Sequence, residues 1–389
     1  MKRKKRVAVL GATGSIGKST LDVLRAGKND FEPVLFSGYR DVPGLLALAK
    51  EYPAAALAFS GDNYGGASDR AGTYVGREGL LRAIAECGAD IVVNGIAGAA
   101  GLEPSLAALE AGANLALANK ETIVMAGELV FGLAKRKKAR IIPVDSEHSA
   151  VFSLLEAHGR DKTAEILLTA SGGPFRKKPL EELKYITPKD ALNHPTWNMG
   201  PKITIDSATL ANKGLEVIEA AEFFDMSVEQ IRVVVHPQSI VHSMIKLKDG
   251  AVYAQLSRPD IRLPIHNALY YPDIVPCSVD PLDFDCLTLE FEKPDYERFP
   301  MLTLAYEASR KGSLYPAVYN AANEVAVSAF VKNRASFSDI PRIVSSVLRN
   351  DWNFGEAFSG ADETLRAILE TDRLAREKAE KFILEMIRC

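Results

Sequence analysis

Short apolar runs alternate with helix-compatible stretches along the first 145 residues. Each run is as short as a buried parallel strand, and a stretch with helical spacing follows it. The predicted strands are Val7 to Leu10, Val34 to Ser37, Ile91 to Val93, Leu115 to Leu117 and Arg140 to Val144, and the predicted helices are Lys18 to Ala26, Leu45 to Glu51, Leu80 to Cys87, Glu103 to Ala111 and Thr122 to Ala134. This alternation predicts an α/β fold with a Rossmann-like doubly wound parallel sheet. No element is predicted for residues 61–76.

The pattern changes after residue 145. Ile166 to Thr169 and Lys202 to Asp206 have strand-like patterns, and two alternating stretches flank Asp249-Gly250, which is a hairpin signal. Residues 272–300 contain several prolines and no sustained periodicity, and helical spacing dominates beyond them. We therefore expect a Rossmann-like domain over 1–145, a central α+β domain over 146–271 with a lid loop at 171–201, a connecting segment over 272–300 and a C-terminal α-helical domain over 301–389.

Composition narrows the possible partners. The 389 residues carry a formal net charge of -3, which gives no electrostatic reason to expect nucleic acid or an anionic membrane as partner. No segment approaches the roughly 18 apolar residues of a membrane span. The basic stretch Lys2 to Arg6 precedes an apolar run too short for a signal peptide, so we interpret it as a solvated arm. The four cysteines are scattered without a C-x-x-C pair, which predicts a reducing, cytoplasmic location.

A glycine-rich turn, Gly11-Ala-Thr-Gly-Ser-Ile-Gly17, joins the first predicted strand to the first predicted helix. Its backbone amides and the helix N-terminus are suited to a dinucleotide pyrophosphate, although a glycine turn without a ligand is the alternative. The second strand ends in neutral and basic residues, and the first acid, Asp41, comes one place later than an NAD site needs. Arg40 could pair with a 2′-phosphate, which favours NADPH, or it could be an ordinary surface arginine.

A second cluster of polar residues follows the strand that ends near Val144. If the backbone stays extended, Asp145 and Glu147 point the same way, and their repulsion favours a divalent cation between them. The alternative is that Asp145 or Ser146 caps a helix beginning near Ser149. Lys120 begins another helix, where a cation is disfavoured unless it has a function.

Further along, one predicted helix carries an amide, an ammonium and a carboxylate near its start. Asn212 and Glu216 share a face, and Lys213 lies beside them, which suits a phosphate and a metal. The long loop before this helix contains Trp197 and Met199, which either shield a substrate from water or anchor the loop on the core. The histidines His236 and His242 are interpreted as structural.

Taken in order, these motifs closely resemble those of the 1-deoxy-D-xylulose 5-phosphate reductoisomerase family. The motifs are the glycine turn, Ala118-Asn-Lys-Glu121, Pro143-Val-Asp-Ser-Glu-His148, Ser171-Gly-Gly-Pro-Phe175, His194-Pro-x-Trp-x-Met-Gly200, Asp206-Ser-Ala-Thr209, Asn212-Lys-Gly-Leu-Glu216 and His236-Pro-Gln-Ser239. The resemblance spans nearly the whole chain. It implies rearrangement and reduction of 1-deoxy-D-xylulose 5-phosphate to 2-C-methyl-D-erythritol 4-phosphate, an isoprenoid precursor, with NADPH and a divalent cation as cofactors. It also implies a homodimer.

The resemblance assigns roles to individual positions. It implies Mg²⁺ or Mn²⁺ ligands at Asp145, Glu147 and Glu216. It implies catalytic roles for Lys120, Glu147, His194 and Glu216, and further substrate contacts at Ser146, Ser171, Trp197, Ser207, Asn212 and Lys213. The implied NADPH contacts are Thr13, Gly14, Ser15, Ile16, Gly38, Asn119, Glu121 and Gly200. Arg40 joins this set through its charge.

The sequence departs from the family pattern at two places, and three other functions remain as alternatives. Tyr39 and Arg40 stand where the family usually has a lysine and an asparagine, and residues 61–76 also differ from the expected pattern. A simple sugar-phosphate dehydrogenase would need no metal. A relative of the aspartate-semialdehyde dehydrogenases would need a catalytic cysteine, and no cysteine here lies at a strand end beside polar partners. A non-catalytic NADPH-binding regulator would need neither the carboxylates nor a lid.

Overall fold

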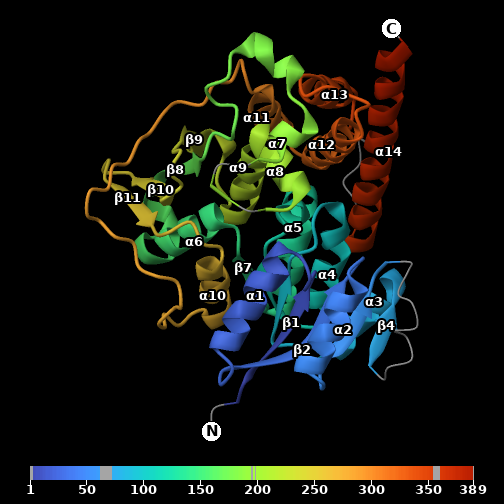
Figure 1. Ribbon diagram of the computed structural model, residues 1–389, viewed down its shortest axis with the longest axis vertical. Helices are drawn as coiled ribbons and strands as arrows, with labels where there is room; N and C mark the ends of the chain where they lie inside the picture. Colours follow the sequence, from blue (N-terminus) through green and yellow to red (C-terminus); the bar gives the residue numbers. More distant parts are fainter. Residues whose placement is uncertain (1–2, 62–71, 194–195, 198, 354–359, 389) are drawn as a thin grey trace. The chain divides into compact units, whose positions relative to one another are not determined.

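The chain forms two compact units, each built from several segments. The computed structural model describes residues 3–61, 72–193, 196–197, 199–353 and 360–388 (Figure 1). Unit 1 comprises Met1–Thr122, Val130–Ser149 and Asp260–Pro281, and unit 2 comprises Ile123–Leu129, Ala150–Pro259 and Leu282–Cys389. The division into four parts that the sequence indicates stays a prediction.

Unit 1 contains a seven-stranded sheet in which all neighbouring strands are parallel, in the order β4-β3-β2-β1-β5-β6-β7. The strands are β1 (Lys5–Leu10), β2 (Phe31–Gly38), β3 (Ala56–Phe59), β4 (Thr73–Val75), β5 (Ile91–Asn94), β6 (Asn114–Leu117) and β7 (Ile141–Pro143). The doubly wound sheet is therefore confirmed, although β3 and β4 were not predicted. Strand order reverses at β1, so the carboxyl ends of β1 and β5 form the switch point where such sheets bind ligands.

Helices connect these strands, as the alternating pattern predicts. They are α1 (Ser15–Ala26), α2 (Val42–Glu51), α3 (Gly76–Glu86), α4 (Leu102–Glu110), α5 (Lys120–Lys137) and α10 (Arg262–Tyr270), with a short η2 turn (Ala99–Gly101). Helix α5 bends at Ala126, whose φ of -148° is not helical. Helix α10 comes from a distant part of the sequence and packs against α1, β6 and β7. The central strand is fully covered, since Val7 to Leu10 are 0% exposed.

Unit 2 combines a small mixed sheet with a bundle of helices. The sheet order is β11-β10-β8-β9, with β8 (Thr163–Ala170), β9 (Ile231–Val235), β10 (Val241–Leu247) and β11 (Val252–Leu256). Strands β10 and β11 form the predicted hairpin, and β8 and β9 are parallel. The helices are α6 (Ser146–His158), α7 (Pro188–Ala191), α8 (Pro201–Ala208), α9 (Ala211–Phe224), α11 (Pro300–Lys311), α12 (Tyr315–Val331), α13 (Asp339–Leu348) and α14 (Ala361–Arg388), with η3 (Arg160–Lys162), η4 (Leu180–Tyr185) and η5 (Val228–Gln230).

The strand predicted for Lys202 to Asp206 is wrong, because these residues lie in helix α8. Five alternating residues are too few to separate a strand from a helix by period. Pro201 occupies the first helical turn, where its fixed φ favours a helix, and α8 packs against α12. Tertiary packing therefore overrides the short alternating pattern.

The core of unit 2 is built around α12. Most residues of this helix are buried, including Tyr319 and Phe330, so the helix is apolar on nearly all sides. As predicted, residues 272–299 form no helix or strand apart from one bridge between Val235 and Glu292. Within the described ranges, every helix is too short or too polar to cross a membrane.

Candidate active site

The glycine turn places an open helix N-terminus at the switch point of the sheet. Gly11 adopts a φ of +75°, and a Cβ on Gly17 would lie 2.4 Å from the carbonyl oxygen of Ala12, so both positions require glycine. Gly14 is the N-cap of α1, and Gly14 and Ser15 are exposed. Exposed backbone amides at a helix start attract phosphate oxygens, which agrees with the predicted pyrophosphate site.

The end of β2 lies beside this turn. The Ser37 hydroxyl accepts a hydrogen bond from the Gly11 amide at 3.1 Å, and Gly38 packs against Leu45. The Asp41 carboxylate accepts from the Gly44 amide at 2.9 Å and thereby caps α2. The exposed Arg40 guanidinium lies 5.4 Å from the centre of the Tyr39 ring. The acid that comes one place late is thus a helix cap, and Arg40 is the charged group presented at this strand end.

Asn119 and Glu121 are buried and stabilise the turn after β6. The Asn119 amide donates to the carbonyl oxygens of Ile96 at 2.6 Å and Gly98 at 2.9 Å, and its Oδ1 accepts from the Thr122 amide at 2.9 Å. It also donates to the Glu121 carboxylate at 3.2 Å. Both residues therefore fix the local backbone, and their contacts with NADPH stay predictions.

Lys120 and Asp145 meet because they follow neighbouring parallel strands, β6 and β7. The Lys120 ammonium donates to Asp145 Oδ2 at 2.7 Å. The lysine is 3% exposed, so its charge needs a buried partner of opposite sign. Two side chains singled out separately in the sequence thus form one ion pair.

The backbone after Asp145 is helical rather than extended, because α6 begins at Ser146. The Asp145 carboxylate accepts from the Glu147 amide at 3.2 Å, as a capping residue does, and its Oδ1 lies 3.4 Å from His148 Nδ1. Ser146 Oγ donates to the Glu147 carboxylate at 2.5 Å. The extended geometry expected for Asp145 and Glu147 is therefore wrong, since helical spacing places Asp145 beside His148 instead.

Glu216 presents a buried carboxylate from α9. It is 1% exposed, its Oε1 accepts from the Asn212 amide at 2.6 Å, and its Oε2 pairs with the Lys213 ammonium. The shared helical face of Asn212 and Glu216 is confirmed. Lys213, which is 3% exposed, supplies the positive charge that a buried carboxylate requires.

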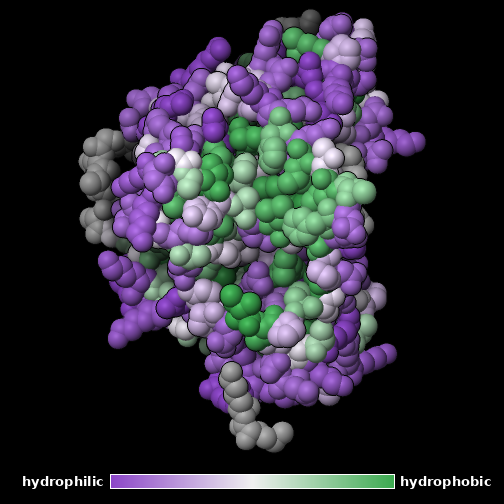
Figure 2. All heavy atoms as spheres, turned by 90° about the vertical axis from the view of Figure 1, so that its left-hand side faces the viewer, coloured by the Kyte–Doolittle hydropathy of each residue, from purple (hydrophilic) through white to green (hydrophobic). Residues whose placement is uncertain are grey.

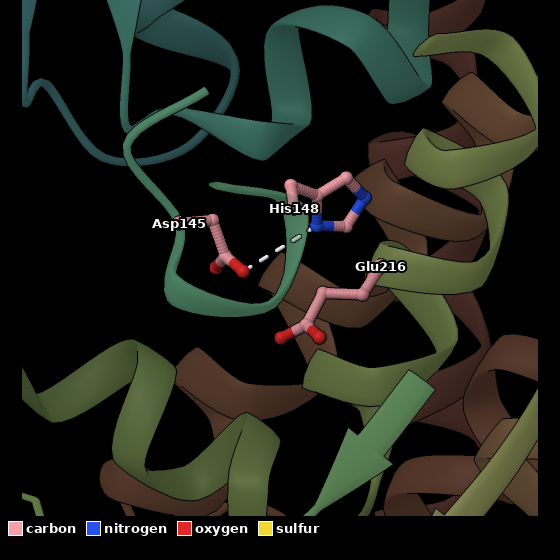
Figure 3. Close-up of side chains that lie close together, drawn as sticks. All are labelled: Asp145, His148 and Glu216. Carbon is pink, nitrogen blue, oxygen red and sulfur yellow. Dashed lines mark hydrogen bonds and ion pairs between the residues drawn. The ribbon is translucent and has the colours of Figure 1, made fainter. Parts of the chain in front are cut away.

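Asp145, His148 and Glu216 offer ligand atoms that all lie within 4.8 Å of one another. Figure 3 shows the three side chains converging, two from the start of α6 and one from α9. Lys120 and Lys213 already compensate the charges of the two carboxylates, so the case for a metal rests on the type and closeness of the donors. Carboxylate oxygens are the ligands that Mg²⁺ and Mn²⁺ prefer in proteins. The donor set therefore fits a divalent cation. Glu147 is not in this group, and its role as a ligand stays a prediction.

His148 is not among the metal ligands that the family resemblance implies. It is 0% exposed, and its proximity to Asp145 follows from the spacing of three between a helix cap and the first helical turn. The signal was present in the sequence, since a capping carboxylate at Asp145 fixes where the helix begins.

The predicted phosphate-binding residues lie on three connected pieces of unit 2. Ser171 follows β8, and Gly172 and Gly173 adopt φ angles of +81° and +69°. A Cβ on Gly173 would lie 2.7 Å from the Ser207 carbonyl oxygen, so this loop contacts the end of α8 directly. Asn212 and Lys213 begin α9 immediately afterwards.

The lid residues are only partly described. His194 lies outside the described residues. Trp197 is half-buried, and its ring centre lies 6.3 Å from that of His242 on β10. Gly200, an implied NADPH contact, is exposed and is the N-cap of α8.

Comparisons with known proteins identify the family of this chain. Family models match three segments: a 1-deoxy-D-xylulose 5-phosphate reductoisomerase model over residues 7–127, its C-terminal domain over residues 141–224, and a DXP reductoisomerase C-terminal domain over residues 256–378. The reductoisomerase of Chlorobium chlorochromatii is 48% identical over 97% of this chain and 99% of its own length. The chain belongs to the 1-deoxy-D-xylulose 5-phosphate reductoisomerase family. The reductoisomerase of Treponema pallidum is 44% identical over 99% of both chains.

Solved reductoisomerase structures have the same fold. A crystal structure of the enzyme in complex with NADPH, fosmidomycin and magnesium is 40% identical, with a TM-score of 0.93, over 98% of this chain and 99% of its own. The reductoisomerase from Zymomonas mobilis in complex with NADPH is 39% identical, with a TM-score of 0.88, over the same shares, 98% and 99%. The reductoisomerase fold that the motifs imply is therefore confirmed.

Proposed function

We propose that this chain converts 1-deoxy-D-xylulose 5-phosphate to 2-C-methyl-D-erythritol 4-phosphate in an NADPH- and divalent-metal-dependent reaction. The convergence of Asp145, His148 and Glu216 carries the proposal, since the chain belongs to the reductoisomerase family and this cluster fits a cation. The related structures with bound NADPH and magnesium support the choice of cofactors. A dehydrogenase without rearrangement has no need for such a cluster.

Asp145, Glu147 and Glu216 are the proposed metal ligands, and His148 is a further donor within reach. A bound divalent cation would stabilise negative charge that develops on two adjacent substrate oxygens. The Lys120 ammonium is a proton donor that lies beside the Asp145 carboxylate, to which it donates a hydrogen bond at 2.7 Å. Ser146, Glu147 and His194 are proposed to contact the substrate oxygens and the reacting carbons. The rearrangement proceeds by a retroaldol and aldol sequence or by a shift, and NADPH supplies the hydride that then reduces the aldehyde.

The phosphate group is assigned to Ser171, Ser207, Asn212 and Lys213. Two hydroxyls, an amide and an ammonium are suitable donors for phosphate oxygens. Trp197 is proposed to cover the bound substrate together with His194 and to exclude water. Binding energy from the phosphate would favour this closed arrangement.

NADPH is assigned to the switch point of the parallel sheet. The exposed start of α1 would hold the pyrophosphate through Thr13, Gly14, Ser15 and Ile16, and Gly38 and Arg40 would face the adenosine phosphate. Asn119, Glu121 and Gly200 complete the proposed contacts. The stacked pair of Arg40 and Tyr39 supports this assignment, because it presents a cation at the end of β2.

The function is tested by following NADPH absorbance with 1-deoxy-D-xylulose 5-phosphate, with Mg²⁺, with Mn²⁺ and after EDTA treatment. We expect oxidation that requires the metal, and a loss of kcat/KM on the order of 100-fold or more in Glu216→Gln. Glu222→Gln, on an exposed position of the same helix, is the matched control and should behave as wild type. Activity that survives EDTA and Glu216→Gln would instead establish a metal-independent dehydrogenase.

A homodimer is the proposed assembly. β11 is an edge strand, and its Val252 and Tyr253 are 51% and 40% exposed. Figure 2 shows apolar side chains at the surface on the face that corresponds to the left-hand side of Figure 1. An exposed apolar edge strand has unpaired backbone groups that a second copy could pair with. A cytoplasmic location is also proposed, and the free thiols of Cys87, Cys277 and Cys286 support it.

A further inference from the structure

A buried polar contact joins helix α12 to helix α8. Asn323 Nδ2 donates to Asp206 Oδ1 at 2.8 Å, and the two residues are 0% and 1% exposed. The other carboxylate oxygen of Asp206 pairs with Lys202 Nζ at 2.9 Å. A buried carboxylate is costly unless it is hydrogen-bonded and paired with a cation, so this contact is strongly constrained in geometry.

Asp206 lies at the start of a tight corner that leads to the predicted phosphate-binding residues. Ser207 is the next residue, and Thr209 Oγ1 donates to the Asp206 carbonyl oxygen at 3.2 Å. The same hydroxyl accepts from the Ala211 amide at 3.2 Å. Leu210 adopts a φ of 59°, which reverses the chain between α8 and α9. Because these hydrogen bonds and the Leu210 conformation hold the corner together, we expect the position of Asp206 to affect where α9 begins.

The same face of α12 also sets the position of α9. Tyr319 lies one turn before Asn323, and its hydroxyl donates to the Met301 carbonyl oxygen at 3.1 Å. A Cβ on Gly214 would lie 2.6 Å from the Tyr319 hydroxyl and 2.7 Å from Ala305 Cβ. Helix α9 therefore packs against Tyr319 and Ala305 with no room for a side chain at position 214. Figure 1 shows α8, α9 and α12 side by side, and all three are in contact. One helical face thus contacts both helices that carry the site.

We propose that Asn323 is a positioning residue of the phosphate site. Its amide holds Asp206, and the corner from Asp206 to Ala211 transmits that position to Ser207, Asn212 and Lys213. The inference rests on the proposed function, because it takes these residues as the phosphate contacts. It also gives a functional role to α12, a helix that carries none of the site residues implied by the family resemblance.

The test compares Asn323→Ala with Asn320→Ala. Asn320 is the same residue type on the same helix, is also 0% exposed, and donates to Met125 Sδ and to Glu324 instead of to α8. Both variants lose buried hydrogen bonds, so we expect both melting temperatures to fall by about 5 °C. Only Asn323→Ala should raise the KM for 1-deoxy-D-xylulose 5-phosphate, by on the order of tenfold or more.

Two readouts separate positioning from a loss of folded protein. Partial unfolding lowers kcat per total enzyme without changing KM, whereas displaced phosphate contacts raise KM. The dissociation constant for NADPH, measured by fluorescence, should be unchanged in Asn323→Ala. An equal KM in the two alanine variants would overturn the inference.

An exchange of the two groups tests the hydrogen bond itself. Asn323→Asp places two carboxylates face to face, and we expect it to raise KM at least as much as the alanine variant. Adding Asp206→Asn restores one amide and one carboxylate, and KM should return to within about threefold of wild type, because the helix contact is re-formed. No recovery in the double variant would contradict the inference. If wild type itself shows no turnover, the proposed function fails instead, so the two failures are distinguishable.

Discussion

At the residue scale, each carboxylate in the cluster of Asp145, His148 and Glu216 lies next to a lysine. Lys120 pairs with Asp145, and Lys213 pairs with Glu216. All four side chains are largely buried, so these pairs compensate charges that would otherwise be costly away from water. Both lysines are also predicted substrate contacts. The ammonium groups that compensate these buried carboxylates are therefore also the ones proposed to contact the anionic substrate.

Arg40 gives a prediction about cofactor preference. Arg40→Glu should raise the KM for NADPH by about 10- to 100-fold, because a charge-assisted bond to the 2′-phosphate becomes a repulsion. The KM for NADH should change much less, since NADH lacks that phosphate. Steady-state kinetics with both cofactors measure the ratio.

Arg82 provides the control for this substitution. Its guanidinium lies 5.2 Å from the centre of the Tyr74 ring, so an exposed arginine of α3 makes a similar contact with a tyrosine of β4. Arg82→Glu should leave both KM values unchanged. An unaltered NADPH to NADH ratio in Arg40→Glu would show that Arg40 is an ordinary surface residue.

At the element scale, Tyr270 connects α10 to the start of β2 in unit 1. Its hydroxyl donates to Asp30 at 2.8 Å, and its ring packs edge-on against Phe31. Burial, followed by the hydrogen bond to Asp30, raises the pKa of Tyr270 from 10.0 to about 12. The folded state thus favours the neutral phenol. This contribution to stability is complete below pH 10 and is lost as the pH rises towards 12.

Tyr270→Phe should therefore flatten the alkaline loss of stability. Between pH 9 and pH 11 we expect the free energy of unfolding to fall less in the variant than in wild type, by about 1 kcal/mol after allowance for solvent screening. Urea denaturation at the two pH values measures this difference. Tyr185→Phe removes an exposed phenol and should retain the wild-type slope. Parallel slopes in Tyr270→Phe and wild type would contradict the prediction.

The elements that sequence predicted well are those with a long or repeated pattern. The parallel sheet follows from several strand and helix pairs, so an error in one pair does not change the fold. α8 was misassigned because five residues cannot define a period, and β3 and β4 were missed because they are short. Motif order indicated most of the site, but the pairing of Asp145 with His148 depends on where α6 begins. Asn323 carries no local signal, since its partner is 117 positions away.

At the scale of the whole molecule, the edge of the small sheet predicts the oligomeric state. Wild type should sediment as a dimer, and Val252→Lys should shift the equilibrium towards the monomer because a lysine on an edge strand opposes pairing. Sedimentation velocity over a range of protein concentrations measures this equilibrium.

Val331 offers the matched control for the dimer. It is 44% exposed, close to the 51% of Val252, but it ends helix α12 rather than lying on the sheet edge. Val331→Lys should remain dimeric. A wild-type protein that is monomeric at every concentration would exclude the proposed assembly.

The return of the chain to unit 1 has a consequence for synthesis on the ribosome. α10 supplies contacts to α1, β6 and β7, yet residues 150–259 separate it from the preceding segment of the same unit. The nascent sheet therefore emerges without one of its covering helices, and at about 5 to 20 residues per second it waits on the order of ten seconds for that helix. During this interval the uncovered apolar surface is open to chaperones and to other nascent chains.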